Sequence, residues 1–147
     1  MLVRIYLDNC CFNRHYDDQN YIRIRLETEA KLYIQDKIKL GEIELVWSYI
    51  LEQENEDNPF EDKRENIQQW VEIAIMDISE SENILTQAES FFKIGSKNKD
   101  ALHIACAIAS GADYFITTDK GILKKRNAIF EIQIVNPIDF LNAQEDV

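Results

Sequence analysis

The chain has 147 residues, a formal net charge of −11 and 46% apolar residues, which suits one domain over 1–147 with a full hydrophobic core. No apolar run is long enough to cross a membrane, and the start of the chain lacks the pattern of a signal peptide, so we expect a cytoplasmic protein. The three cysteines fit neither a disulfide framework nor a zinc site, and the negative charge argues against broad nucleic-acid binding.

Short β-like runs alternate with longer helical runs along the chain, which predicts an α/β fold with a parallel sheet and helices on both faces. In chain order, the expected elements are a strand over 2–7, a helix over 21–40, a strand over 43–47, a helix capped by Ser48 that runs towards Asn58, a helix over 64–75, a strand over 76–78, helices over 82–94 and 100–110, a strand over 114–117, a helix over 121–125, a strand over 132–135 and a short helix after Pro137.

Four acidic residues are expected at one edge of this sheet, because ligands bind at the carboxyl ends of the strands in open parallel sheets. Asp8 follows the first strand directly, and Asp119 comes two residues after the fourth. Asp100 opens the nearly all-apolar helix that leads into the fourth strand. Glu54 lies on the helix that leaves the second strand.

Each acid has a purely structural explanation when it is taken alone. Asp8, Asp100 and Asp119 could cap helices or turns, and Glu54 could be a solvated helix residue. Taken together, clustered carboxylates repel one another, and some would be forced to bind protons unless a cation lay among them. Ligands that are all oxygen suit Mg²⁺ or Mn²⁺.

The choice of acid on the helix after Ser48 stays open between Glu54 and Glu52. Glu54 follows Ile50 and Leu51 at helical spacing, so it shares the face that they turn towards the sheet. Glu52 points elsewhere and is expected to be solvated. His103 lies one turn after Asp100, and we expect a buried core residue there rather than a ligand.

Three segments of the chain resemble PIN-domain proteins, which include the ribonuclease toxins of bacterial toxin–antitoxin pairs. They are YLDNCCFNR over 6–14, WSYILEQEN over 47–55 and KDALHIACAIASGADYFITTD over 99–119. The resemblance covers nearly the whole chain and is most specific in the third segment. It implies a three-layer α/β/α sandwich around a mainly parallel sheet of 4–5 strands, an acidic pocket that holds Mg²⁺ or Mn²⁺, and hydrolysis of RNA phosphodiester bonds.

The resemblance also assigns roles by position. The residues that match the four acids of the family, as catalytic residues and metal ligands, are Asp8, Glu54, Asp100 and Asp119. The expected supporting residues are Asn9, Ser48 and Thr117. The residues expected to bind the RNA backbone are Lys97, Lys99, Lys120 and Lys124. The partners implied are an RNA substrate, a cognate antitoxin and a second copy of the chain.

Departures from the family and rival functions keep alternatives open. Asn9 and two cysteines follow Asp8, where many members have Thr or Ser, and the segment over 55–94 does not match the compact toxins. The alternative function is a catalytically silent PIN-fold module that binds RNA or protein. A phosphotransfer domain would need a second acid close after Asp8, and a nucleotide-binding enzyme would need a glycine-rich loop; the chain has neither.

Overall fold

The computed structural model describes residues 2–144, and its centre is a parallel sheet of five strands in the order β3-β2-β1-β4-β5. The strands are β1 (Arg4–Leu7), β2 (Glu44–Ser48), β3 (Met76–Ile78), β4 (Tyr114–Ile116) and β5 (Gln133–Val135). In the register of the sheet, Tyr6 of β1 is paired with Val46 of β2 on one side and with Phe115 of β4 on the other. All four strand pairings are parallel, so the carboxyl ends of the strands meet along one edge, which we call the carboxyl edge.

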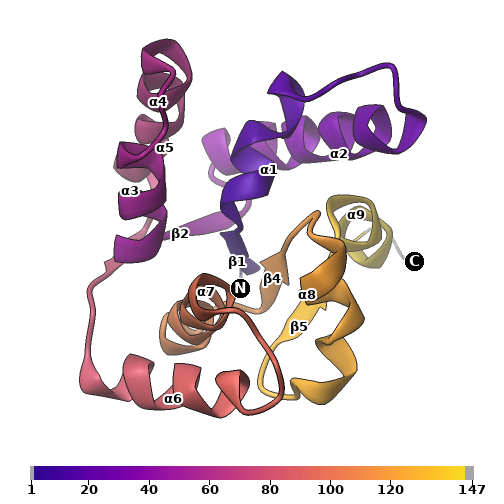
Figure 1. Cartoon of the computed structure of the whole chain (residues 1–147). Helices are drawn as coiled ribbons and strands as arrows, with labels where there is room; N and C mark the ends of the chain where they lie inside the picture. Colours follow the sequence, from indigo (N-terminus) through magenta and orange to yellow (C-terminus); the bar gives the residue numbers. More distant parts are fainter. Residues whose placement is uncertain (1, 145–147) are drawn as a thin grey trace.

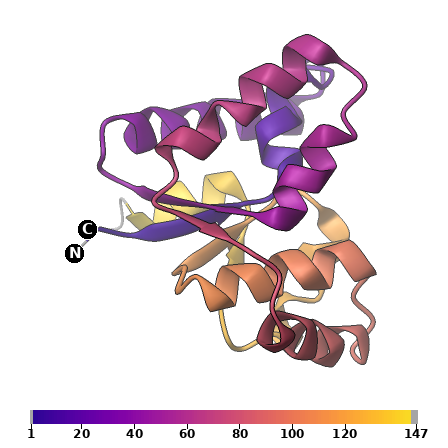
Figure 2. The ribbon, with the colours of Figure 1, turned by 90° about the vertical axis from the view of Figure 1, so that its left-hand side faces the viewer.

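Helices cover both faces of the sheet and make a three-layer α/β/α sandwich, as the resemblance implies (Figures 1 and 2). The helices are α1 (Asn9–Asn13), α2 (Ile22–Lys39), α3 (Tyr49–Glu56), α4 (Glu61–Gln68), α5 (Trp70–Ile73), α6 (Glu82–Phe92), α7 (Asn98–Ala109), α8 (Lys120–Lys124) and α9 (Pro137–Gln144), with short 3₁₀ turns η1 (Arg14–Tyr16) and η2 (Arg126–Ala128). In Figure 2, α6 and α7 lie on one face and α2 to α5 on the other, and α9 packs against α2. None of the helices within residues 2–144 has both the length and the hydrophobicity to cross a membrane.

The central strand β1 is buried on both faces, which is why it lacks the polar alternation of a half-exposed strand. Ile5, Tyr6 and Leu7 are each 0% exposed. The nearly all-apolar helix α7 packs against β2 and β4 and against α6. This packing accounts for the apolar composition of α7, because its buried residues include Ala101, Ile104 and Cys106.

Several predicted boundaries are wrong, and each has a local reason. The helix expected over 64–75 is two helices that are separated at Gln69; α4 begins earlier than expected, at Glu61, and α5 ends at Ile73 because Ala74 takes the extended geometry that leads into β3. Asp100 does not open α7; it lies in the first turn, and Lys97 occupies the N-cap position. The short α1 was not expected, since five residues are too few to show a helical period.

A buried lysine without an acidic partner is an unusual feature of α2. Lys31 is 0% exposed, and its ammonium donates to Gln35 at 3.1 Å and lies 2.6 Å from Nδ1 of His15. Burial lowers the pKa of Lys31 to about 8, with the nearby Lys39 acting in the same direction and Cys11 opposing it. Burial, together with the positive charge of Lys31, also lowers the pKa of His15 to about 4. The charged form of Lys31 is therefore a cost to the folded state at neutral pH.

We predict that Lys31→Met increases the free energy of unfolding at pH 7 by about 1–3 kcal/mol, because it removes a charge that burial disfavours. In the wild type the unfolded chain keeps the Lys31 proton up to the ordinary lysine pKa of 10.5, whereas in the folded chain the pKa is about 8. The unfolded state then binds more protons between these values, so wild-type stability should rise with pH through that window. The variant should lack this contribution in urea unfolding measured from pH 7 to pH 11.

Lys37→Met is the matched control on the same helix. Glu42 raises the pKa of Lys37, so the removal of Lys37 should not increase the free energy of unfolding at pH 7. The prediction would be contradicted if Lys31→Met were less stable than the wild type and its free energy of unfolding still rose with pH as in the wild type. The buried lysine would then not be what destabilises the folded state.

Candidate active site

Asp8 lies where β1 ends, and neighbouring donors hold its carboxylate in place. The Asp8 side chain accepts hydrogen bonds from the Asn9 amide at 2.8 Å, from the Thr117 hydroxyl at 2.8 Å and from the Cys10 thiol at 3.5 Å. Its own amide donates to the Ile116 carbonyl at 2.9 Å. Asp8 is therefore fixed by the end of β4 and the start of α1, and it is only 7% exposed.

Glu54 and His103 approach Asp8 from two helices on opposite faces of the sheet. Glu54 lies on α3 and His103 on α7. Nε2 of His103 contacts Oε1 of Glu54 and lies 3.9 Å from Oδ1 of Asp8. The ligand atoms of these three residues all lie within 4.8 Å of one another. We call this group the Asp8–Glu54–His103 cluster.

A buried hydrogen-bonded chain orients the imidazole of His103. Its Nδ1 lies 2.6 Å from the hydroxyl of Tyr6, which lies 2.6 Å from the hydroxyl of Ser48. Ser48 also caps α3 by accepting from the Leu51 amide at 3.2 Å. Ser48 was expected to support the acids; the structure places it behind the histidine, linked to His103 through Tyr6 and separated from the carboxylates. Asn9 and Thr117, in contrast, contact Asp8 directly.

The pKa values of two groups show how closely the charges lie. Burial raises the pKa of Asp100, and the negative charges of Asp8 and Asp119 raise it further. Burial alone would lower the pKa of His103, but the hydrogen bond with Glu54 and the charges of Asp8, Glu54 and Asp100 give a net rise. Asp100 is therefore influenced by the charges of Asp8 and Asp119, and His103 by those of Asp8, Glu54 and Asp100.

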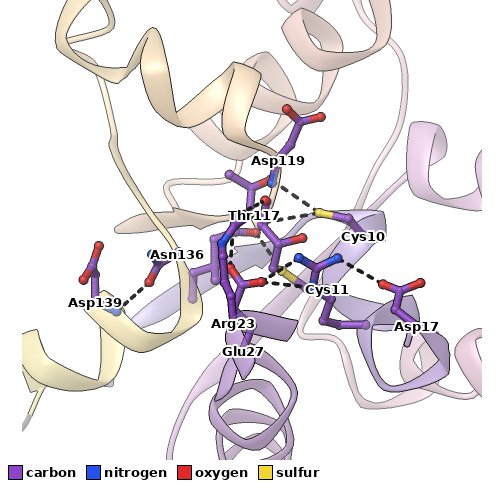
Figure 3. Close-up of polar contacts among 12 residues, drawn as sticks. Cys10, Cys11, Asp17, Arg23, Glu27, Thr117, Asp119, Asn136 and Asp139 are labelled. Carbon is purple, nitrogen blue, oxygen red and sulfur yellow. Dashed lines mark hydrogen bonds and ion pairs between the residues drawn. The ribbon is translucent and has the colours of Figure 1, made fainter. Parts of the chain in front are cut away.

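Asp119 and Asp100 lie outside the Asp8–Glu54–His103 cluster. Asp119 is the N-cap of α8, and its carboxylate accepts from the amides of Gly121 at 2.7 Å and Ile122 at 3.2 Å. Figure 3 shows this carboxylate pointing away from Thr117 and Cys10. In this structure, Asp119 therefore acts as a helix cap, which is the structural role considered for it from the sequence.

The two glutamates of α3 have different surroundings. Glu52 accepts from the indole of Trp47 at 3.0 Å and from the side chain of Gln68 at 3.0 Å. It is half-buried rather than solvated, which corrects the prediction, and it faces α4 instead of Asp8. The helical-face argument placed Glu54 on the side that faces the sheet, and the structure brings Glu54 to the cluster.

His103 is the residue at this site whose contacts sequence reasoning did not anticipate. Its burial was expected, since it is 1% exposed. Its contact with two carboxylates was not. The available signal was its spacing of three residues after Asp100, which puts both side chains on one face of α7.

An ion network anchors the segment that carries Thr117 and Asp119. Arg23 of α2 donates to the Thr118 carbonyl at 3.1 Å and pairs at 3.3 Å with Glu27, which is fully buried. Arg14 pairs with the same carboxylate at 2.6 Å. The network ties α2 to the loop between β4 and α8.

The four lysines proposed to bind RNA are exposed and flank the acids. Lys97 and Lys99 lie at the start of α7, and Lys120 and Lys124 lie on α8. The positive charge of Lys97 partly opposes the net rise in the pKa of Asp100. These lysines are therefore on the segments that carry Asp100 and Asp119.

The fold and this edge define a parallel α/β protein with a carboxylate-rich cluster at the carboxyl ends of its strands. The PIN domain family matches residues 5–128, and the chain belongs to this family. A comparison with curated proteins finds no match.

Among solved structures, the chain is similar to one described as the crystal structure of VapBC2 from Rickettsia felis bound to a DNA fragment from their promoter. The TM-score is 0.58 at 16% identity, with 91% of this chain and 98% of that chain covered. This similarity shows a shared fold.

We predict that Asp119→Ala lowers the free energy of unfolding by about 1 kcal/mol in the absence of metal, because it removes the N-cap of α8. Asp119→Asn should lose less than half of that amount, since its side-chain oxygen can still accept from the Gly121 amide. Urea unfolding in EDTA measures both. Equal stability of Ala, Asn and wild type would mean that the cap contributes nothing in solution.

Proposed function

We propose that the chain is a metal-dependent endoribonuclease that hydrolyses phosphodiester bonds in RNA. The observation that carries this proposal is the Asp8–Glu54–His103 cluster at the carboxyl edge, with Asp100 close enough for the charges of Asp8 and Asp119 to raise its pKa beyond the effect of burial. Membership of the PIN domain family supports the same chemistry.

The donor set fits a divalent cation such as Mg²⁺ or Mn²⁺. Asp8 and Glu54 supply carboxylate oxygens, and the repulsion that raises the pKa of Asp100 would be relieved by positive charge. When bound, the ion supplies a Lewis acid that activates water and offsets charge on the phosphate oxygens.

The chain's own residues then have separate roles in the proposed reaction. Asp8 is the main ligand, held by Asn9 and Thr117 so that it needs no rearrangement. Glu54 completes the cluster, and Asp100 and Asp119 orient water or a second ion.

The four exposed lysines would bind the phosphate backbone of the RNA and place one linkage over the acids. Lys97, Lys99, Lys120 and Lys124 supply positive charge beside Asp100 and Asp119, although the chain as a whole carries −11. Binding through them should weaken as salt rises.

The biological setting we propose is that of a toxin in a toxin–antitoxin pair, acting on RNA in the cytoplasm with a cognate antitoxin and as a homodimer. The fold shared with VapBC2 supports this setting. The second candidate is a catalytically silent RNA- or protein-binding module. The net charge of −11 speaks for this candidate over the nuclease.

We predict that Asp8→Asn lowers the rate of RNA cleavage by at least about 100-fold while the fold is kept, because a fixed charge at the reacting centre is lost. The assay is cleavage of a mixed panel of labelled RNAs with Mg²⁺, Mn²⁺ or EDTA, with circular dichroism to check folding. Asp36→Asn, an exposed acid on α2, is the matched control and should keep full activity.

Two results would contradict the proposed function. One is full activity of Asp8→Asn in the presence of metal. The other is wild-type cleavage that persists in EDTA. Absence of cleavage together with absence of metal binding would favour the silent binding module.

A further inference from the structure

We propose that His103 is a direct metal ligand through Nε2, and that the site therefore prefers a divalent transition metal such as Mn²⁺ over Mg²⁺. The proposal rests on the metal-dependent function proposed above and specifies the ligand set. It changes an all-carboxylate site into one with a nitrogen ligand.

Nε2 of His103 lies near two acids that come from other elements of the fold. It lies 3.9 Å from Oδ1 of Asp8 and contacts Oε1 of Glu54. Two ligand atoms that are each about 2.1 Å from one ion lie about 3–4 Å apart, depending on the angle at the ion. The pair formed by Nε2 and Asp8 already has this separation. Glu54 is partly exposed, with 21% of its side chain accessible, so it can move outward to admit an ion.

Hydrogen-bonded side chains support the imidazole of His103 from behind. Metal-ligating histidines almost always use the other ring nitrogen in a hydrogen bond that fixes the ring and its tautomer. Here Nδ1 is engaged by the hydroxyl of Tyr6, which is in turn engaged by Ser48. Tyr6 and Ser48 are 0% exposed and His103 is 1% exposed. This buried chain holds the ring so that Nε2, and not Nδ1, faces the carboxylates.

The donor set combines carboxylate oxygens with an imidazole nitrogen. Mg²⁺ binds oxygen and keeps much of its water, whereas imidazole suits first-row transition metals. Among divalent transition metals the affinity of such a site rises from Mn²⁺ onward. A set of Asp8, Glu54 and His103 should therefore discriminate between Mn²⁺ and Mg²⁺ more strongly than four carboxylates would.

A structural alternative explains the same contact without a metal–nitrogen bond. In it, Nε2 of His103 only donates a hydrogen bond to Glu54 and positions that carboxylate. The two explanations differ in whether the imidazole nitrogen is bonded to the ion, and this can be measured without any activity assay.

The experiment loads the full chain with Mn²⁺ alone and records pulsed electron paramagnetic resonance for ¹⁴N couplings of a directly bound imidazole. The chain has only two histidines, so His15→Gln is the matched control. Wild type and His15→Gln should both show the coupling, and His103→Gln should lose it. By titration calorimetry, His103→Gln should weaken Mn²⁺ binding by about 10-fold or more and Mg²⁺ binding by less.

Tyr6→Phe keeps the test decisive if His103→Gln fails to fold. It removes the partner of Nδ1 but leaves Nε2 in place, so the ¹⁴N coupling should persist with weaker Mn²⁺ binding. Mn²⁺ binding to the wild type without ¹⁴N coupling would overturn direct ligation, and equal affinity for Mg²⁺ and Mn²⁺ would overturn the preference. Metal-dependent RNA cleavage could still stand after either result, which separates this inference from the proposed function.

Discussion

The pairing of β1 between β2 and β4 is the constraint on which the site depends. It brings the carboxyl ends of three strands together, so that Asp8 from one strand meets Thr117 from the next at 2.8 Å. The Asp8 amide continues this pairing through its bond to the Ile116 carbonyl. Helices that leave the same edge then deliver Glu54 from one face of the sheet and His103 from the other.

Gathering acids at this edge has an electrostatic cost, which the structure offsets only in part. Burial raises the pKa of Asp100, and the negative charges of Asp8 and Asp119 raise it further. Against the effect of burial, the hydrogen bond with Glu54 and the charges of Asp8, Glu54 and Asp100 raise the pKa of His103. Both groups therefore lie among negative charges that a bound cation would offset. A protein that used this edge only for binding would have no evident need to keep Asp8 and Glu54 so close to one buried imidazole.

The sequence predicted most of the fold, because the signals that mattered were strong and local. Buried strands appeared as continuous apolar runs, and the helix cap predicted at Ser48 was confirmed. The split between α4 and α5 was missed, since apolar spacing continues across it. At the site, a single sequence indicated which segments meet but not how side chains turn. The outward carboxylate of Asp119 and the inward imidazole of His103 depend on tertiary contacts.

The central claim is that Asp8, Glu54 and His103 form one metal site, and anomalous diffraction from crystals grown with Mn²⁺ tests it most directly. We expect an anomalous peak bounded by Oδ1 of Asp8, a carboxylate oxygen of Glu54 and Nε2 of His103. A peak held only by Asp100 and Asp119, or no peak from crystals in which this edge is open to solvent, would contradict the account.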